Sequence, residues 1–247
     1  MEREALIFLH IPKTAGTTLN RIIDWQYSPF SIFTIDAHQV RATAERFKSL
    51  PERRRCRFRV VRGHLLYGIH EFLPQGATYI TLLREPVARV LSSYNFISRD
   101  PLNPLHRKFR KERLTVEDLI RLTPNRQNLQ CRFRAGIGAI RDVRMRRRSG
   151  RVTSGRICEK RMLDLAKENL RSFRVVGLCE RFQESLLLMI TSFGWNVSFY
   201  QNRKVSKIRS FIEPHVVDVI HEHIASTSSF MTLQRSSLQK TFAGMQA

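Results

Sequence analysis

A stretch near the start of the chain, "HIPKTAGTT", combines the residue types that hold phosphate groups. Lys13 brings a positive charge, and Gly16 lets the backbone approach a ligand closely. Hydroxyl donors are supplied by Thr14, Thr17 and Thr18. Ordinary roles are also open to these residues, because a lysine in a turn is commonly solvated and a threonine commonly caps a helix. Together the residues favour a turn that binds an anion.

The segments on either side of this turn predict a strand before it and a helix after it. Residues 5–11, "ALIFLHI", have the composition of a buried strand, and Leu19, Ile22 and Ile23 recur at the spacing of a buried helix face. The N-terminus of a helix offers unpaired N–H groups and the positive end of its dipole to an anion. We therefore expect a strand, turn and helix that form a phosphate cradle.

The order of the residues in the turn differs from that of a nucleotide triphosphatase loop. Such a loop reads G-x-x-x-x-G-K-[ST], with the lysine after the last glycine and a hydroxyl beside it that binds magnesium. Here Lys13 precedes Gly16, and the first glycine is absent. The turn is thus predicted to hold phosphate without a metal. A P-loop-type kinase or nucleotide-binding protein is the alternative.

Strand and helix patterns alternate along the rest of the chain. Strand composition recurs at 58–64, 77–83 and 173–178, and helical spacing at 87–94, 163–170 and 216–224. A strand, a crossover helix and a second strand in this order favour a parallel sheet. We therefore predict an α/β fold with a P-loop-like parallel sheet, helices on both of its faces and a helical C-terminal portion.

The chain is strongly basic, and its length suits one domain over residues 1–247. Forty-three Lys and Arg against 21 Asp and Glu give a net charge of +22, which attracts nucleic acid, anionic lipid or anionic substrates. Seven arginines gather at 141–156, where we expect a solvated, mobile loop. A nucleic-acid-binding protein is a second alternative, although the excess of basic residues is spread along the chain rather than interleaved with aromatics.

Metal-ligand spacing and export signals are both missing from the sequence. No pair of cysteines has the C-x-x-C spacing and no histidines form H-E-x-x-H, so no zinc site is expected; the cysteines are Cys56, Cys131, Cys158 and Cys179. The apolar run at 5–9 is too short for a signal peptide, and no run reaches the roughly 18 apolar residues of a membrane span. We therefore expect neither a bound metal nor a transmembrane anchor.

Two motifs resemble those of a known family. "HIPKTAGTTL" resembles the 5′-phosphosulfate-binding motif of sulfotransferases that use 3′-phosphoadenosine-5′-phosphosulfate (PAPS), especially the carbohydrate O-sulfotransferases that include the heparan sulfate 2-O and 6-O enzymes and soluble bacterial members. "TLLREPVARVLSSYNF", residues 81–96, is similar to the family's 3′-phosphate-binding segment. Residues 166–189 resemble a further downstream segment, so the likeness extends over about residues 5–200.

The resemblance implies a donor and the residues that bind it. The donor would be PAPS, the product 3′,5′-ADP (PAP), and no metal would be required. Lys13 would also be catalytic, since a fixed cation stabilises the charge that builds on the oxygen leaving sulfur. The 5′-phosphosulfate would be held by Lys13, Thr14, Ala15, Gly16, Thr17 and Thr18, and the 3′-phosphate by Arg84 and Ser92. Arg84 has another role open to it, since it could pair with Glu85 or cap a carbonyl group.

A hydroxyl acceptor must lose its proton, and a histidine with a pKa near neutrality suits that task. In the heparan sulfate 2-O group the base is a histidine that follows a glycine between the two motifs, and His64 is the matching position in "VVRGHLLYG". A histidine that is merely packed or hydrogen bonded is the alternative. Other candidate bases are His70, Glu71 and Glu85, while His10 is interpreted as a structural or phosphate-side group.

The resemblance implies an O-sulfotransferase of the EC 2.8.2 class that acts on a hydroxyl acceptor, expected to be a carbohydrate. The basic charge suits an anionic glycan, and a neutral glycan is also open. No specific nucleic acid is expected as a partner. Because Golgi relatives are membrane-anchored, the missing anchor leads us to expect a cytoplasmic, bacterial enzyme. The alternative is the trimmed lumenal domain of a Golgi enzyme.

Overall fold

The computed structural model describes residues 4–123, 128–136, 155–197 and 214–223. They belong to two compact units, each built from two segments of the chain. The first unit contains Met1–Leu83 and Gln130–Arg203, and the second contains Arg84–Leu129 and Lys204–Ala247. The prediction of one domain over residues 1–247 stays a prediction. Of the predicted basic loop, residues 141–154 lie outside the described residues, and Gly155 and Arg156 begin a helix.

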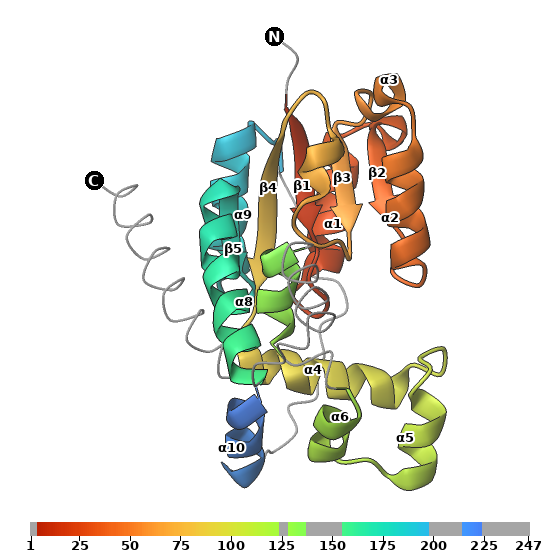
Figure 1. Ribbon diagram of the computed structural model, residues 1–247, viewed down its shortest axis with the longest axis vertical. Coiled ribbons are helices and arrows are strands. Elements are labelled where there is room, and N and C mark those ends of the chain that lie inside the picture. The colour runs from red at the N-terminus through yellow and green to blue at the C-terminus, as the bar shows by residue number, and fades with distance from the viewer. Residues whose placement is uncertain (1–3, 124–127, 137–154, 198–213, 224–247) are drawn as a thin grey trace, which may run out of the picture. The chain divides into compact units, whose positions relative to one another are not determined.

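The first unit contains a five-stranded, fully parallel sheet (Figure 1). Its strands are β1 (Ala5–Leu9), β2 (Ile32–Ile35), β3 (Val60–Gly63), β4 (Ala77–Leu83) and β5 (Phe173–Leu178), in the order β2-β3-β1-β4-β5. The chain passes from β1 to one edge and later crosses to the other side of β1. The carboxyl end of β1 is therefore a topological switch point, which is where parallel sheets bind ligands. The predicted α/β fold with a parallel sheet is confirmed.

Helices flank the sheet, and their amphipathic patterns explain where they form. The helices of the first unit are α1 (Gly16–Gln26), α2 (Val40–Ser49), α3 (Glu52–Arg55), one at 129–136, α8 (Gly155–Asn169) and α9 (Phe182–Phe193), with short 3₁₀ turns η1 (Pro29–Ser31), η2 (Ile69–Phe72), η4 (Leu170–Ser172) and η5 (Cys179–Arg181). In α1 the predicted face of Leu19, Ile22 and Ile23 is buried. The whole of β1 is buried as well, as expected for a central parallel strand.

Arg62 of β3 joins the first helix to the sheet. One of its terminal nitrogens lies 2.7 Å from a carboxylate oxygen of Asp24, and the other donates a hydrogen bond to the carbonyl oxygen of Asn20. Both partners lie on α1, and Nε of Arg62 also donates to the hydroxyl of Thr34 on β2. A guanidinium with several donors in a fixed plane suits such a junction. The junction holds α1 beside β3, which precedes His64.

The second unit is helical in its described part. It contains α4 (Pro86–Arg99), α5 (His106–Glu112), α6 (Val116–Leu122) and α10 (Pro214–His223). Pro86 occupies the first turn of α4 as predicted, because its fixed φ suits a position that needs no N–H partner. Val87 and Val90 of α4 pack with Ile120 and Ile220 in one apolar cluster. The predicted C-terminal helical portion is thus present as α10, while Ile224 lies outside the described residues.

Candidate active site

The turn between β1 and α1 has an uncommon backbone conformation. Lys13 has a φ of 72° and Ala15 a φ of 63°, in the left-handed region that residues with a side chain seldom adopt. Ala15 is the N-cap of α1, and no side chain of the described residues caps this helix. Such strain concentrates at ligand sites, and turns of mixed handedness direct successive N–H groups at an anion. The predicted phosphate cradle therefore has a fitting backbone as well as a fitting composition.

The three threonines of the turn have different surroundings. Thr14 is fully buried, and its hydroxyl donates a 2.8 Å hydrogen bond to the carbonyl oxygen of Ile11. Thr17 is exposed, whereas Thr18 is buried and its N–H donates to the carbonyl oxygen of Ala15. That the three hydroxyls donate to a phosphate stays a prediction, and the hydroxyl of Thr14 already has a partner within the turn. The Thr14 hydroxyl stabilises the turn, and the role left to this residue is a backbone contact.

His10 lies over the first residue of α1. A Cβ on Gly16 would stand 2.0 Å from both Cδ2 and Nε2 of the His10 imidazole. The same ring stacks on Phe8, with centroids 5.3 Å apart and an interplanar angle of 11°. Phe8 and His10 are two residues apart, so in an extended chain their side chains project to the same face. Gly16 therefore meets a side chain of the protein at the place where we expected it to meet only a ligand.

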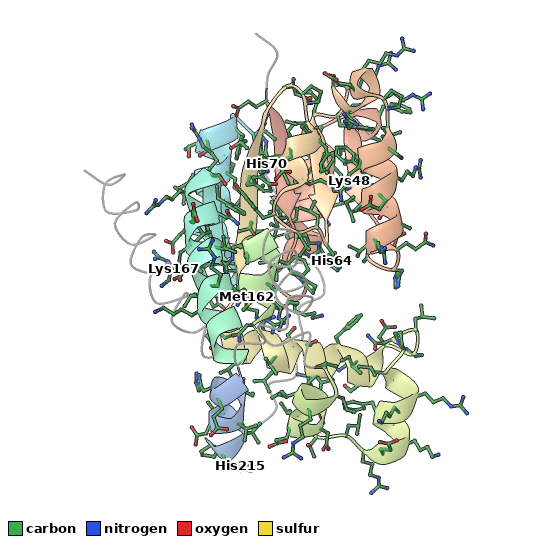
Figure 2. The ribbon with its side chains drawn as sticks, viewed as in Figure 1. Lys48, His64, His70, Met162, Lys167 and His215 are labelled. Atoms are coloured by element: carbon green, nitrogen blue, oxygen red, sulfur yellow. The ribbon has the colours of Figure 1, made fainter. Side chains whose placement is uncertain are left out.

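His64 follows the last residue of β3, at the carboxyl edge of the sheet (Figure 2). The N–H of Leu65 donates to the carbonyl oxygen of Gly63 at 2.9 Å, which makes His64 the centre of a three-residue turn. Its ring meets that of His10 edge-on, with centroids 4.7 Å apart. Burial, and next the charge of His38, lower the pKa of His64 below its ordinary value. The imidazole is consequently neutral at pH 7 and able to accept a proton.

The glycine before His64 is required by the sheet. Gly63 has a φ of 134°, and a Cβ there would lie 2.3 Å from the carbonyl oxygen of Ile35 on the neighbouring strand β2. Both the dihedral angle and the contact exclude a larger residue without strain. The packing of β3 against β2 thus explains why a glycine precedes His64.

Arg84 and Ser92, the residues predicted to hold the 3′-phosphate, both belong to the second unit. Arg84 directly follows the last residue of β4, and Ser92 is partly buried in α4. Arg89 of α4, which no sequence motif indicated, is buried and only 3% exposed. Residues three and four apart share a helix face, so Arg89 is on the face of Ser92 and Ser93. That Arg84 and Ser92 bind one phosphate stays a prediction.

A family model described as "Sulfotransferase family" matches residues 1–228, most of the chain. The chain belongs to the sulfotransferase family. No curated protein matches the sequence. Among solved structures, mouse sulfotransferase SULT7A1 complexed with PAP is similar at 17% identity, with a TM-score of 0.42. The match covers 80% of this chain and 61% of the mouse chain.

Two other candidate bases, His70 and Glu71, lie in the short turn η2, which precedes β4. The Tyr79 hydroxyl accepts hydrogen bonds from the N–H groups of Gly68 and His70 and lies 2.9 Å from Nδ1 of His70. The Tyr79 hydroxyl and Nδ1 of His70 therefore share a hydrogen bond whose direction depends on the tautomer of the ring. Burial raises the pKa of the Tyr79 hydroxyl, and the charge of Glu71 contributes to the rise. Tyr79 lies in the first half of β4, so His70, which contacts its hydroxyl, lies away from the carboxyl edge of the sheet and from His64 (Figure 2).

Glu85, the remaining candidate base, caps α4. Its two carboxylate oxygens accept hydrogen bonds from the N–H groups of Val87 and Ala88, at 2.9 and 2.6 Å. Replacing Glu85 by alanine is expected to lower the free energy of unfolding by about 1 kcal/mol, because an N-cap is lost. Chemical denaturation measures this loss, with the exposed Glu45→Ala as control. A large fall in transfer rate without loss of stability would return Glu85 to the list of candidate bases.

Metal-binding groups and membrane-spanning helices are both absent from the part of the chain that the structure describes. In that part no group of three or more His, Cys, Asp or Glu side chains is placed to hold a metal ion. None of the helices described there is long and apolar enough to cross a bilayer.

Proposed function

We propose that this chain transfers a sulfuryl group from PAPS to a hydroxyl acceptor, with His64 as general base. The observation that carries the proposal is the arrangement at the carboxyl edge of β1 and β3. There a neutral imidazole lies in contact with His10, whose ring in turn covers the start of the phosphate turn. The side chain of His10 thus separates the candidate proton acceptor, His64, from the turn that is proposed to bind the anion. Acyl, sulfuryl and phosphoryl transfers all need such a pair, and membership of the sulfotransferase family favours sulfuryl transfer.

The turn suits the phosphosulfate end of such a donor. Its N-cap lacks a side-chain partner, its backbone is left-handed at Lys13 and Ala15, and it carries the charge of Lys13. Backbone N–H groups of residues 14–17 would bind the oxygens of the 5′-phosphate, while that of Thr18 donates to the carbonyl oxygen of Ala15. The Thr17 hydroxyl is exposed and would add a donor. Arg84 and Ser92 are proposed to bind the 3′-phosphate, and no metal is needed for either contact.

The roles of the residues follow from the charges that change during transfer. PAPS, as donor substrate, supplies the sulfuryl group and leaves as PAP. His64 takes the proton of the acceptor hydroxyl while the acceptor oxygen forms its bond to sulfur. Lys13 stabilises the negative charge that develops on the phosphate oxygen as the bond from sulfur to that oxygen breaks. The turn holds the reacting atoms in line, which replaces an encounter in solution by a fixed geometry.

A carbohydrate is the acceptor that we propose. The net charge of +22 favours an anionic glycan, whose carboxylates or sulfates would be attracted by arginine side chains. Transfer from PAPS to a panel of uronate-containing, sulfated and neutral glycans, with lipids and small alcohols beside them, would identify the acceptor class. A cytoplasmic location in a bacterium stays a prediction.

Ligand-induced stabilisation tests the donor. A ligand present at 100 times its Kd adds about 2.7 kcal/mol to the free energy of unfolding, which raises Tm by roughly 5 to 10 °C for a chain of this size. We expect this rise with 3′,5′-ADP and a much smaller one with 5′-AMP, which lacks the 3′-phosphate. ATP with magnesium serves as the competing ligand. Stabilisation by ATP with magnesium, and none by 3′,5′-ADP, would replace the proposal by a kinase-type function.

A further inference from the structure

His10 connects the phosphate turn with the candidate base through its backbone as well as its ring. The carbonyl oxygen of Gly63 accepts hydrogen bonds from the N–H of His10, at 3.0 Å, and from the N–H of Leu65, at 2.9 Å. The first bond fixes the end of β1, and the second closes the turn centred on His64. One carbonyl group therefore sets the positions of both histidines relative to each other.

The ring of His10 fills the space between Gly16 and His64. It is largely buried, stacks on Phe8 and meets the His64 ring at a centroid distance of 4.7 Å. Within the described residues neither imidazole has a hydrogen-bond partner, so ring contacts, with Phe8 and between the two histidines, orient them. Close-packed rings transmit a displacement of one to the next.

The backbone of Gly16 does not itself demand glycine. Gly16 is the first residue of α1 and its φ lies outside the left-handed region, so alanine fits the backbone there. What excludes a Cβ is the His10 ring, at 2.0 Å. A ring stacked on Phe8 and largely buried has little room to move aside.

We infer that His10 is a positioning residue that sets the distance between the phosphate turn and His64, and that Gly16 is required by the His10 ring rather than by the bound donor. The inference rests on the function proposed above. It differs from the usual reading of a glycine in a phosphate turn, in which the ligand itself needs the space. The two accounts make opposite predictions for a double variant.

The experiment measures the affinity for 3′,5′-ADP of the full chain and of three variants, Gly16→Ala, His10→Ala and the two combined. Gly16→Ala should weaken binding about tenfold, within the range of couplings between residues in contact. His10→Ala opens the space that the new methyl group needs, so the double variant should regain most of the affinity. His10→Ala alone should bind with little change.

Several outcomes decide the matter. If the parent chain itself fails to bind 3′,5′-ADP, the proposed function fails and not this inference alone. If the parent binds but the double variant stays as weak as Gly16→Ala, or if Gly16→Ala binds as well as the parent, the inference is overturned. Where Gly16→Ala does not fold and the double variant does, the same coupling is seen in stability and supports the inference.

The pH dependence of the transfer rate gives a further test, because it should not change in the variants if the role of His10 were purely structural. The cations facing His10 are Lys13 and Arg62, and His64 faces both His10 and His38. In His10→Ala, water reaches His64 and its pKa returns toward the ordinary value, so the acid limb of the transfer rate moves to higher pH. In His10→Phe an aromatic ring stays in place, and the limb should stay where it is.

We also expect kcat of His10→Ala to fall about 10- to 100-fold with the affinity for 3′,5′-ADP retained, since a misplaced base costs rate rather than donor binding. His10→Phe should restore part of that rate. An unchanged kcat and an unmoved acid limb in His10→Ala would together overturn the positioning role, even if both Gly16 variants failed to fold.

Discussion

Replacing His64 by alanine is expected to lower the rate of sulfuryl transfer about 10²- to 10⁴-fold, the usual contribution of a general base. Stabilisation by 3′,5′-ADP should persist, because the donor is proposed to be bound by the turn, Arg84 and Ser92, and His64 is not among these residues. The measurement is the initial transfer rate with saturating PAPS and acceptor, together with Tm in the presence of 3′,5′-ADP.

Two further variants make the assignment specific. His221→Ala removes an exposed histidine of α10 and should leave both readouts unchanged. Lys13→Ala keeps a Cβ at the same left-handed position, so the backbone cost is similar, yet transfer and donor binding should both decline. A His64→Ala enzyme with normal activity would remove His64 from the role of base, whatever the Lys13 variant does.

Acidification is expected to destabilise the protein through His10. Burial, followed by the charges of His64, Arg62 and Lys13, lowers the pKa of His10 from 6.5 to about 3. The unfolded chain then binds a proton between these two values that the folded chain does not, so stability rises with pH in that window and is lost as the pH falls. A difference of this size corresponds to on the order of 4 kcal/mol of unfolding free energy between pH 6.5 and 3.

Denaturant unfolding of the parent and of His10→Phe at pH 7 and pH 4 tests this effect. Carboxylates titrate over the same range in both proteins, so the quantity of interest is the difference between the two pH dependences. His10→Phe should lose less stability on acidification by roughly 3 kcal/mol, which is the part of the His10 effect expected above pH 4. Parallel losses in both proteins would show that His10 is not held neutral by its surroundings.

The strands that the sequence predicted best are those buried on both sides. The predicted bounds of β4 and β5 agree with the structure, because continuous apolar runs are typical of parallel strands that are covered on both faces. The strand β2 was not predicted. It has four residues, is only half-buried and pairs with a single neighbour, β3, so its composition carries little signal. The prediction for β1 was two residues too long, since the chain turns away at His10 although Ile11 is still buried.

At the candidate site, sequence reasoning identified residue types and missed contacts between them. Lys13, Gly16 and His64 could be selected because their local motif and their position after a strand are visible in the sequence. That the His10 ring covers Gly16 and touches His64 depends on the pairing of β1 with β3, which brings residues more than 50 positions apart together. The hydrogen bond between His70 and Tyr79 is likewise a side-chain contact, here between residues nine positions apart. Side-chain packing of this kind has no local signature.

The order of the strands also bears on how the chain folds as it is made. Strands β1 to β4 lie within the first 83 residues, but β4 gains its outer partner only when β5, at Phe173–Leu178, has been synthesised. Until then the apolar β4 presents an open edge, and closing the pair requires a loop of nearly 90 residues. Pairings so distant in sequence slow folding and prolong exposure to aggregation. The pairing of β5 with β4 is therefore the folding step that we expect to limit expression yield and to depend on chaperones.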